Sequence, residues 1–154
     1  MKRFVIKVGS AVLRENSELS LERLNNLVDL IAKLKNEKNH QVILVSSGAV
    51  AAGNTTLDLD KKEIVNRQVL AAIGQPLLMK HYKKRFGDHD IKCAQMLLVA
   101  EDFDSRKRSS NAKSVMEILL ENNILPIINE NDVIANEELL FGDNDQLGAH
   151  CAHF

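Results

Sequence analysis

Tryptophan is absent from this chain of 154 residues, and aromatic residues make up only 4% of it. A chain of this length forms one domain and buries roughly 68–70% of the surface that its unfolded state exposes. With so few aromatic rings, the core must be built from aliphatic side chains. The composition, 45% hydrophobic and 27% charged, is typical of a folded globular domain and excludes a disordered or fibrous protein.

Cysteine is scarce as well. The two cysteines, Cys93 and Cys151, lie far apart and neither belongs to a CxxC pair. This spacing argues against a disulfide framework or a structural zinc site, and it indicates a reducing compartment. There is no run of about 18 apolar residues, so the sequence predicts no membrane-spanning helix. The first residues contain only a short apolar run before Lys7, unlike a secretory signal, and we expect a cytoplasmic protein.

Neither sign of charge predominates. Lys and Arg together number 20, Asp and Glu together number 21, and the formal net charge is −1. A protein that holds a polyanion over its whole surface carries a large positive excess. The balance of charge therefore argues against a nucleic-acid partner for this segment.

Apolar segments rich in β-branched residues alternate with segments of helical periodicity along the whole chain. This alternation predicts an α/β fold, an open and mostly parallel sheet with helices on both faces. We expect strands at residues 3–7, 41–46, 91–99 and 124–128.

Three helices are expected between these strands. Ser20 is a good N-cap for the first, whose apolar stripe consists of Leu21, Leu24, Leu27, Val28, Ile31 and Leu34. The second covers about residues 61–86, with a break or kink at Gly74-Gln75-Pro76. The third covers about residues 109–121 and ends at Asn122-Asn123. Its inward-facing residues are predicted to be Ala112, Val115, Met116, Leu119 and Leu120.

The final segment, residues 142–154, predicts a capped helix start followed by a mostly apolar helix. This predicted helix reaches the last residue, Phe154, without a glycine, lysine or proline stop signal. We therefore expect a chain that is cut inside its fold.

Polar and small residues follow several of the predicted strands. Because ligands of parallel sheets bind where the strands end, these residues are the candidates for a site. Lys7 alone is most simply a surface lysine. However, the next residues, Gly9 and Ser10, would let the turn present backbone amides and an ammonium to phosphate oxygens. After the second strand, the Ser47-Gly48 turn either allows tight helix packing or lets a substrate lie against backbone N–H groups.

Asn129-Glu130-Asn131-Asp132 consists of poor strand formers, so we expect a loop there. This loop either caps a helix or holds a zwitterion, because Asp pairs with an ammonium and Asn offers both donor and acceptor atoms. Asp143-Asn144-Asp145 has the same two interpretations.

Several common sites are excluded. Gly48 and Gly53 have the spacing of a phosphate-binding P-loop, but Asn54-Thr55 replaces the required Lys-Ser/Thr pair. The dinucleotide motif GxGxxG and the hydrolase motif GxSxG are both absent. The five histidines show no metal-ligand spacing, and even His150 and His153, three residues apart, lack further ligands, so no metal-ligating residue is predicted.

Taken together and in order, the motifs KVGS at Lys7, SSGAVAAG at Ser46, NEND at Asn129 and GDND at Gly142 resemble those of the amino-acid kinase family. The resemblance covers nearly the whole chain. The combination of SSGAVAAG, NEND and GDND is most similar to the branch of that family that phosphorylates glutamate. Membership of this branch implies transfer of the γ-phosphoryl group of ATP to the side-chain carboxylate of L-glutamate, the first step of proline biosynthesis.

The resemblance also implies roles for residues. Lys7 would neutralise the transferring phosphoryl group, Asp145 would orient Lys7, and Gly9 and Ser10 would contact ATP. The substrate-binding residues would be Ser47, Gly48, Asn129, Asp132, Asp143 and Asn144. The implied cofactors are ATP and Mg²⁺, with the ion bridging the phosphates.

The same resemblance makes residues 1–154 the amino-acid-binding part of the kinase domain, without the part that binds ATP. We therefore expect this chain alone not to turn over. The implied partners are L-glutamate, ATP, proline as a feedback inhibitor, and further copies in a dimer or tetramer. The alternatives are a kinase of the same family with another carboxylate acceptor, and a noncatalytic small-ligand sensor on a flavodoxin-like sheet.

Overall fold

The computed structural model describes residues 1–135 and 144–153. Its central sheet contains four parallel strands in the order β1, β4, β6, β5. Their bounds are Arg3–Val8 for β1, Gln41–Ser46 for β4, Cys93–Leu98 for β5 and Leu125–Glu130 for β6. Lys7 of β1 lies opposite Val45 of β4, which lies opposite Ile128 of β6. The parallel α/β fold expected from the sequence is confirmed.

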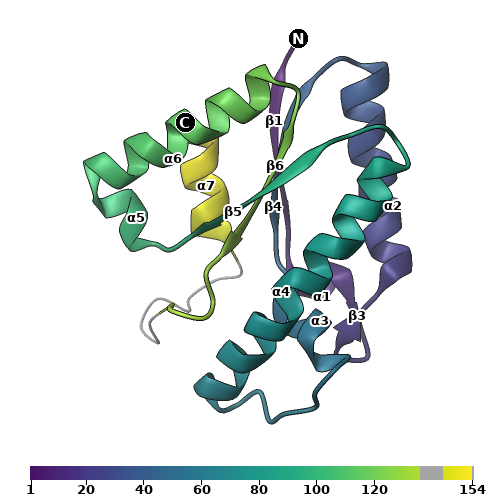
Figure 1. The fold of residues 1–154 in the computed structure, drawn as a ribbon, viewed down its shortest axis with the longest axis vertical. Helices are drawn as coiled ribbons and strands as arrows, with labels where there is room; N and C mark the ends of the chain where they lie inside the picture. Colours follow the sequence, from purple (N-terminus) through teal and green to yellow (C-terminus); the bar gives the residue numbers. More distant parts are fainter. Residues whose placement is uncertain (136–143, 154) are drawn as a thin grey trace.

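Helices and one hairpin fill the connections (Figure 1). The α-helices are α1 (Ser10–Leu13), α2 (Leu21–Ala32), α3 (Ala49–Asn54), α4 (Ile64–Gly87), α5 (Glu101–Asp104), α6 (Arg106–Glu121) and α7 (Asp145–His153). Helix α2 continues into a π-helical turn, η1 (Lys33–Glu37). The two-residue strands β2 (Arg14–Glu15) and β3 (Glu18–Leu19) pair antiparallel around Asn16 and Ser17, which both have positive φ. This turn has the geometry of a tight hairpin.

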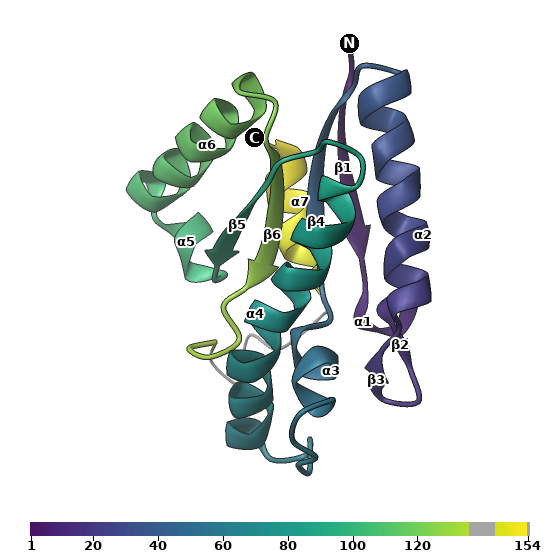
Figure 2. The same cartoon turned by 45° about the vertical axis from the view of Figure 1, so that its right-hand side comes forward.

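Helices cover both faces of the sheet (Figures 1 and 2). Alternate residues of β4 point to opposite sides: Val42 and Leu44 pack into one buried cluster, and Ile43 and Val45 pack into the other. The first cluster contains apolar residues of α2 and α4, and the second contains those of α6 and α7. Aliphatic residues dominate both, although Tyr82 and Phe86 are the largest fully buried side chains.

The sequence predicts a break or kink at Gly74-Gln75-Pro76, and the break is wrong, because α4 continues from Ile64 to Gly87 with Pro76 inside it. The exposed ring of Pro76 removes only one backbone donor, while buried side chains hold the helix on both sides of it. Gly74 does not break the helix but allows it to pack closely on α3. A Cβ there would lie 1.7 Å from the carbonyl oxygen of Ala49, so the missing side chain is what lets α4 lie directly on α3.

Three predicted details of the elements are also wrong. Val115 of α6 is 50% exposed and Leu21 of α2 is 48% exposed, because the buried stripe of each helix is narrower than its apolar pattern. Asn129 and Glu130 belong to β6 and not to a loop, since they pair with Leu97 and Leu98 of β5. Backbone pairing with a neighbouring strand here outweighs the low strand preference of Asn and Glu.

The other strand predictions hold to within two residues at each end. Residues 41–46 are exact, while β5 is shorter than the expected 91–99. Helix α6 begins at Arg106, three residues before the predicted start, with Ser105 as its N-cap. Within the described ranges, no helix is both long and apolar enough to span a bilayer.

Candidate active site

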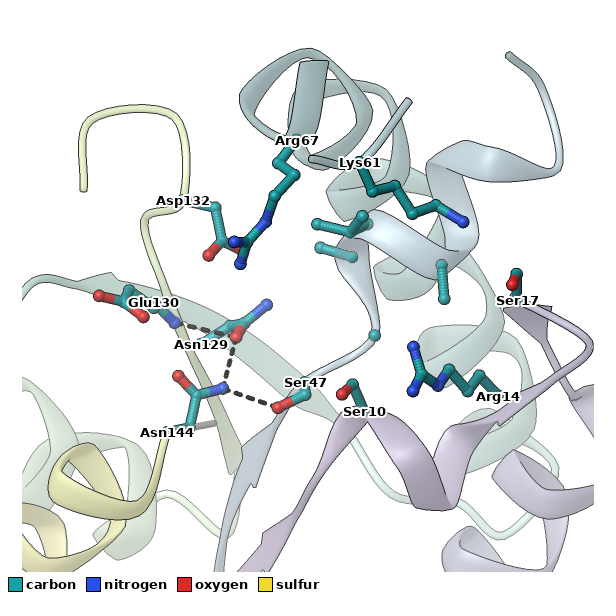
Figure 3. Close-up of a pocket in the computed structure, with 14 residues that line it drawn as sticks. Ser10, Arg14, Ser17, Ser47, Lys61, Arg67, Asn129, Glu130, Asp132 and Asn144 are labelled. Carbon is teal, nitrogen blue, oxygen red and sulfur yellow. Dashed lines mark hydrogen bonds between the residues drawn. The ribbon is translucent and has the colours of Figure 1, made fainter. Parts of the chain in front are cut away.

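The carboxyl ends of β1, β4 and β6 meet at one edge of the sheet, beside the start of α7. A cavity of about 300 Å³ opens at this edge (Figure 3). Six of the residues expected from the sequence line it: Ser10, Ser47, Gly48, Asn129, Asp132 and Asn144. Strand direction brings together those that follow a strand, because parallel strands all end on the same side, and the start of α7 adds Asn144.

Gly48 shapes the turn that joins β4 to α3. Its φ of 111° lies in a region that side chains rarely adopt, so glycine is required at this position. The backbone N–H of Ser47 donates to the carbonyl of Val8 at 3.0 Å, and that of Ala52 donates to the carbonyl of Gly48 at 2.9 Å. These bonds fix Ser47 and Gly48 at the floor of the cavity.

A network of buried amides connects the strands below the cavity. Nδ2 of Asn144 lies 2.9 Å from Oδ1 of Asn129, 3.1 Å from Oγ of Ser47 and 3.1 Å from the carbonyl oxygen of Ser46. Asn144 has a φ of 60°, and its carbonyl accepts from the N–H of Gly148 in the first turn of α7. The residue therefore starts α7 with its backbone and joins β4 to β6 with its side chain.

Lys7 forms an ion pair with Asp145, the first residue of α7. Its Nζ lies 2.6 Å from Oδ1 of Asp145, with 26% of the Lys7 side chain and 72% of the Asp145 side chain exposed. Gly148, one turn further along α7, lies against the aliphatic stem of Lys7. Neither member of the pair lines the cavity, and neither does Gly9. The predicted ammonium and the predicted pocket thus lie at the same sheet edge, but side by side.

The upper wall of the cavity is acidic. Asp132 and Glu130 are half-buried, and burial raises the pKa of both carboxyl groups. The neighbouring carboxylates of Asp132 and Glu101 raise the pKa of Glu130 further, whereas the guanidinium of Arg67 lowers both values. In Figure 3 the side chain of Arg67 extends from α4 toward Asp132. A cationic ligand group placed here would relieve the cost of burying the acids.

Sequence reasoning missed the basic side of the cavity. The basic residues not anticipated there are Arg14, Lys61 and Arg67, with Ser17 beside them, whereas Glu130 belongs to the NEND segment that the sequence had marked. The Asn16-Ser17 turn was a signal for the hairpin that carries Arg14 and Ser17. Nothing in the sequence distinguishes Arg67 from a surface arginine at the start of a helix, since its position depends on how α4 packs.

Asp143, the remaining predicted site residue, lies outside the described residues. Within the part of the chain that the structure describes, no group of three or more His, Cys, Asp or Glu side chains is arranged to hold a metal ion. His150 stacks on Phe103 of α5, with ring centroids 4.3 Å apart. Cys151 is buried, and burial raises the pKa of its thiol to about 12.

Comparison with known proteins agrees with this geometry. Residues 2–154 match the model of the amino acid kinase family. The chain belongs to this family. It is 55% identical to glutamate 5-kinase of Wolinella succinogenes, 52% identical to glutamate 5-kinase of Leishmania donovani and 48% identical to that of Thermus thermophilus. These alignments cover 98–100% of the chain but only 60%, 57% and 41% of the respective relatives, so the chain spans less than two thirds of their length.

Proposed function

We propose that the natural protein containing this chain transfers the γ-phosphoryl group of ATP to the side-chain carboxylate of L-glutamate. The product is glutamyl 5-phosphate, and the reaction is the first step of proline biosynthesis. Residues 1–154 supply the amino-acid-binding part of the kinase domain, and the remainder of the ATP site lies elsewhere in the natural protein. Three relatives named glutamate 5-kinase, each at least 48% identical, support this choice within the family.

The observation that carries the proposal is the Lys7–Asp145 ion pair beside the cavity. A carboxylate is already ionised at neutral pH and needs no base to attack a phosphoryl group. The obstacle is the approach of two anions, so the site must provide positive charge and positioning. Asp145 holds the Lys7 ammonium at the sheet edge, where it neutralises charge on the transferring group.

The cavity has the charge pattern that glutamate requires. At about 300 Å³ it suits a small ligand, and glutamate carries one ammonium and two carboxylates. Asp132 pairs with the α-ammonium. Arg67, which faces Asp132, pairs with the α-carboxylate on the same carbon atom. The side-chain carboxylate then extends past Ser47 toward Lys7.

ATP approaches from the β1 side, where Gly9 and Ser10 follow Lys7. Bound together with ATP, Mg²⁺ would supply positive charge that offsets the negative charge of the phosphates. Ions of this kind are held largely by phosphate oxygens and need few protein ligands. Lys7, Gly9 and Ser10 position the phosphates against the substrate carboxylate.

The test uses the longest natural chain that contains these residues. We expect ADP formation that depends on L-glutamate, with an acyl phosphate that hydroxylamine traps as a hydroxamate. Aspartate and acetylglutamate should be poor substitutes. ADP release that is independent of glutamate, or faster with another acceptor, contradicts the proposal.

Lys7→Met provides the residue-level test. Methionine keeps the length of the side chain but removes the ammonium, and the loss of one charge-stabilising group lowers kcat by about 10²–10³-fold. Lys92→Met is the matched control, because Lys92 is exposed and lies just before β5, at the opposite edge of the sheet. Equal activity of the two variants would remove Lys7 from the mechanism.

A further inference from the structure

Two backbone groups fix the orientation of the buried amides. The N–H of Glu130 donates to Oδ1 of Asn129 at 2.9 Å, and because a backbone N–H only donates, the amide oxygen must be on that side. The carbonyl of Ser46 accepts from Nδ2 of Asn144 at 3.1 Å, and because a carbonyl only accepts, the amide nitrogen must be on this side. The direction of the whole network follows from these two bonds.

One end of the network leads to Gln75 on α4. With Oδ1 of Asn129 occupied by the N–H of Glu130 and by Asn144, its Nδ2 donates to Oε1 of Gln75 at 2.8 Å. Asn129 is 2% exposed, so water cannot readily replace Gln75 as the acceptor. Gln75 in turn donates to Gln95 at 3.1 Å, but this last bond is exposed.

The other end leads to the hydroxyl of Ser47. Oγ of Ser47 accepts from Nδ2 of Asn144, so its own proton points elsewhere. In residues 1–135 and 144–153, no acceptor for this proton is found, and Ser47 lines the cavity. A hydroxyl in this state is a donor directed at a ligand, and the ligand group it suits is a carboxylate.

We propose that Gln75 is a positioning residue which, through Asn129 and Asn144, keeps the Ser47 hydroxyl as a donor for a carboxylate of the bound amino acid. The inference rests on the proposed function. Gln75 does not line the cavity, so its role is assigned through Asn129 and not through direct contact with the substrate. Together with the N–H of Glu130, the carbonyl oxygen of Gln75 keeps Oδ1 of Asn129 turned toward Asn144, so that Nδ2 of Asn144 is held between Asn129, Ser46 and Ser47.

Loss of the Gln75 acceptor loosens this arrangement. Nδ2 of Asn129 is then a buried donor without a partner, so the Asn129 amide, held only through Oδ1, would shift toward another acceptor and strain its bonds from Glu130 and Asn144. Asn144 stays anchored on the carbonyl of Ser46, but without a fixed Asn129 its Nδ2 is no longer held against Ser47. The Ser47 hydroxyl would then be less well placed for the substrate, so affinity for the amino acid falls while the ATP side stays intact.

Three variants of the longest natural chain test the proposal. Gln75→Met has nearly the same shape but no good acceptor. Gln75→Glu keeps the acceptor for Asn129, loses the donor to Gln95 and adds one negative charge. Gln95→Met is the matched control, since it removes the exposed bond and leaves Gln75 in place. Each is measured for kcat, for the KM of glutamate and of ATP, for glutamate binding by titration calorimetry without ATP, and for thermal unfolding.

For Gln75→Met we expect the Kd and the KM for glutamate to rise about tenfold, with kcat and the KM for ATP within about twofold of wild type. Gln75→Glu and Gln95→Met should stay within about threefold for all constants. The inference is overturned if Gln75→Met binds glutamate like wild type, if Gln95→Met weakens binding equally, or if kcat and the KM for ATP change as much. A wild-type protein without glutamate-dependent ADP formation would overturn the proposed function, and the inference with it.

Discussion

Replacement of Gly74 by alanine tests the contact between α3 and α4 that holds the cavity floor. A Cβ at position 74 would lie 1.7 Å from the carbonyl oxygen of Ala49 and 2.3 Å from the backbone nitrogen of Gly53. Both are backbone atoms and cannot rotate away. Overpacking costs about 1–3 kcal/mol, and contact with backbone places Gly74→Ala at the upper end, near 3 kcal/mol. The higher helix propensity of alanine returns about 1 kcal/mol, which leaves a net loss of about 2 kcal/mol.

The assay is thermal unfolding followed by circular dichroism. In a domain of this size, 1 kcal/mol shifts Tm by about 2–4 °C, so Gly74→Ala should unfold about 4–8 °C below wild type. Gly87→Ala is the matched control on the same helix, because a Cβ at Gly87 would meet no atom within 4 Å. Its Tm should be unchanged or slightly higher. Equal Tm values for the two variants would show that α3 and α4 do not approach each other in this way.

Two further predictions concern buried charges, and thermal unfolding across pH checks both. Glu130→Gln should raise Tm at neutral pH, because burial, Asp132 and Glu101 raise the pKa of Glu130 and so disfavour its ionised form in the folded protein. Wild-type stability is lost as pH rises from the ordinary glutamate pKa through the raised one. The difference in Tm between variant and wild type should therefore disappear at about pH 4 and below. A difference that persists at acid pH would contradict this cause. Lys35→Met should also raise Tm at pH 7, because Lys35 is 8% exposed and burial lowers the pKa of its ammonium, which donates to Asn123 at 2.9 Å. Because the pKa of Lys35 is lower in the folded than in the unfolded protein, the wild type becomes more stable relative to the variant as pH rises through the lowered pKa. A Tm difference that stays constant with pH would refute the reasoning.

The sheet could be predicted from the sequence because each strand carries its own signal. Residues 41–46 form a short apolar run bounded by polar residues, and the strand has these bounds in the structure. The hairpin of β2 and β3 could not be predicted in the same way, since two-residue strands are too short to show a period. Its cause is the pair of positive φ angles at Asn16 and Ser17, which belongs to turn chemistry and not to hydrophobic patterning.

Errors in the sequence-based predictions arose where tertiary contacts outweigh local preference. Asn129 and Glu130 are poor strand formers, yet pairing with β5 extends β6 through both. Pro76 normally ends a helix, yet packing on both sides of it keeps α4 continuous. In each case the deciding partner lies far away in the sequence.

The residues of the candidate site also fall into two groups, those that strand positions predict and those whose position depends on tertiary packing. Lys7, Ser47 and Asn129 come from strand ends, and topology alone places them at one edge. Arg67 and Gln75 come from α4, whose close approach to α3 depends on the missing side chains at Gly53 and Gly74. A single sequence does not reveal which face of that helix meets the cavity.

Two adjacent residues at the start of α7 make contacts at two separate places, the cavity and the Lys7 side chain beside it. Asn144 directs its side chain into the network under the cavity, and the very next residue, Asp145, holds Lys7 beside the cavity. Any shift of α7 along the sheet would therefore move the cavity wall at Asn144 and the Lys7 ammonium together. The left-handed φ of Asn144 makes this arrangement sensitive, because most residues avoid such a backbone conformation while Asn tolerates it. Asn at this position thus serves the turn and the hydrogen-bond network at once, whereas glycine could serve only the turn.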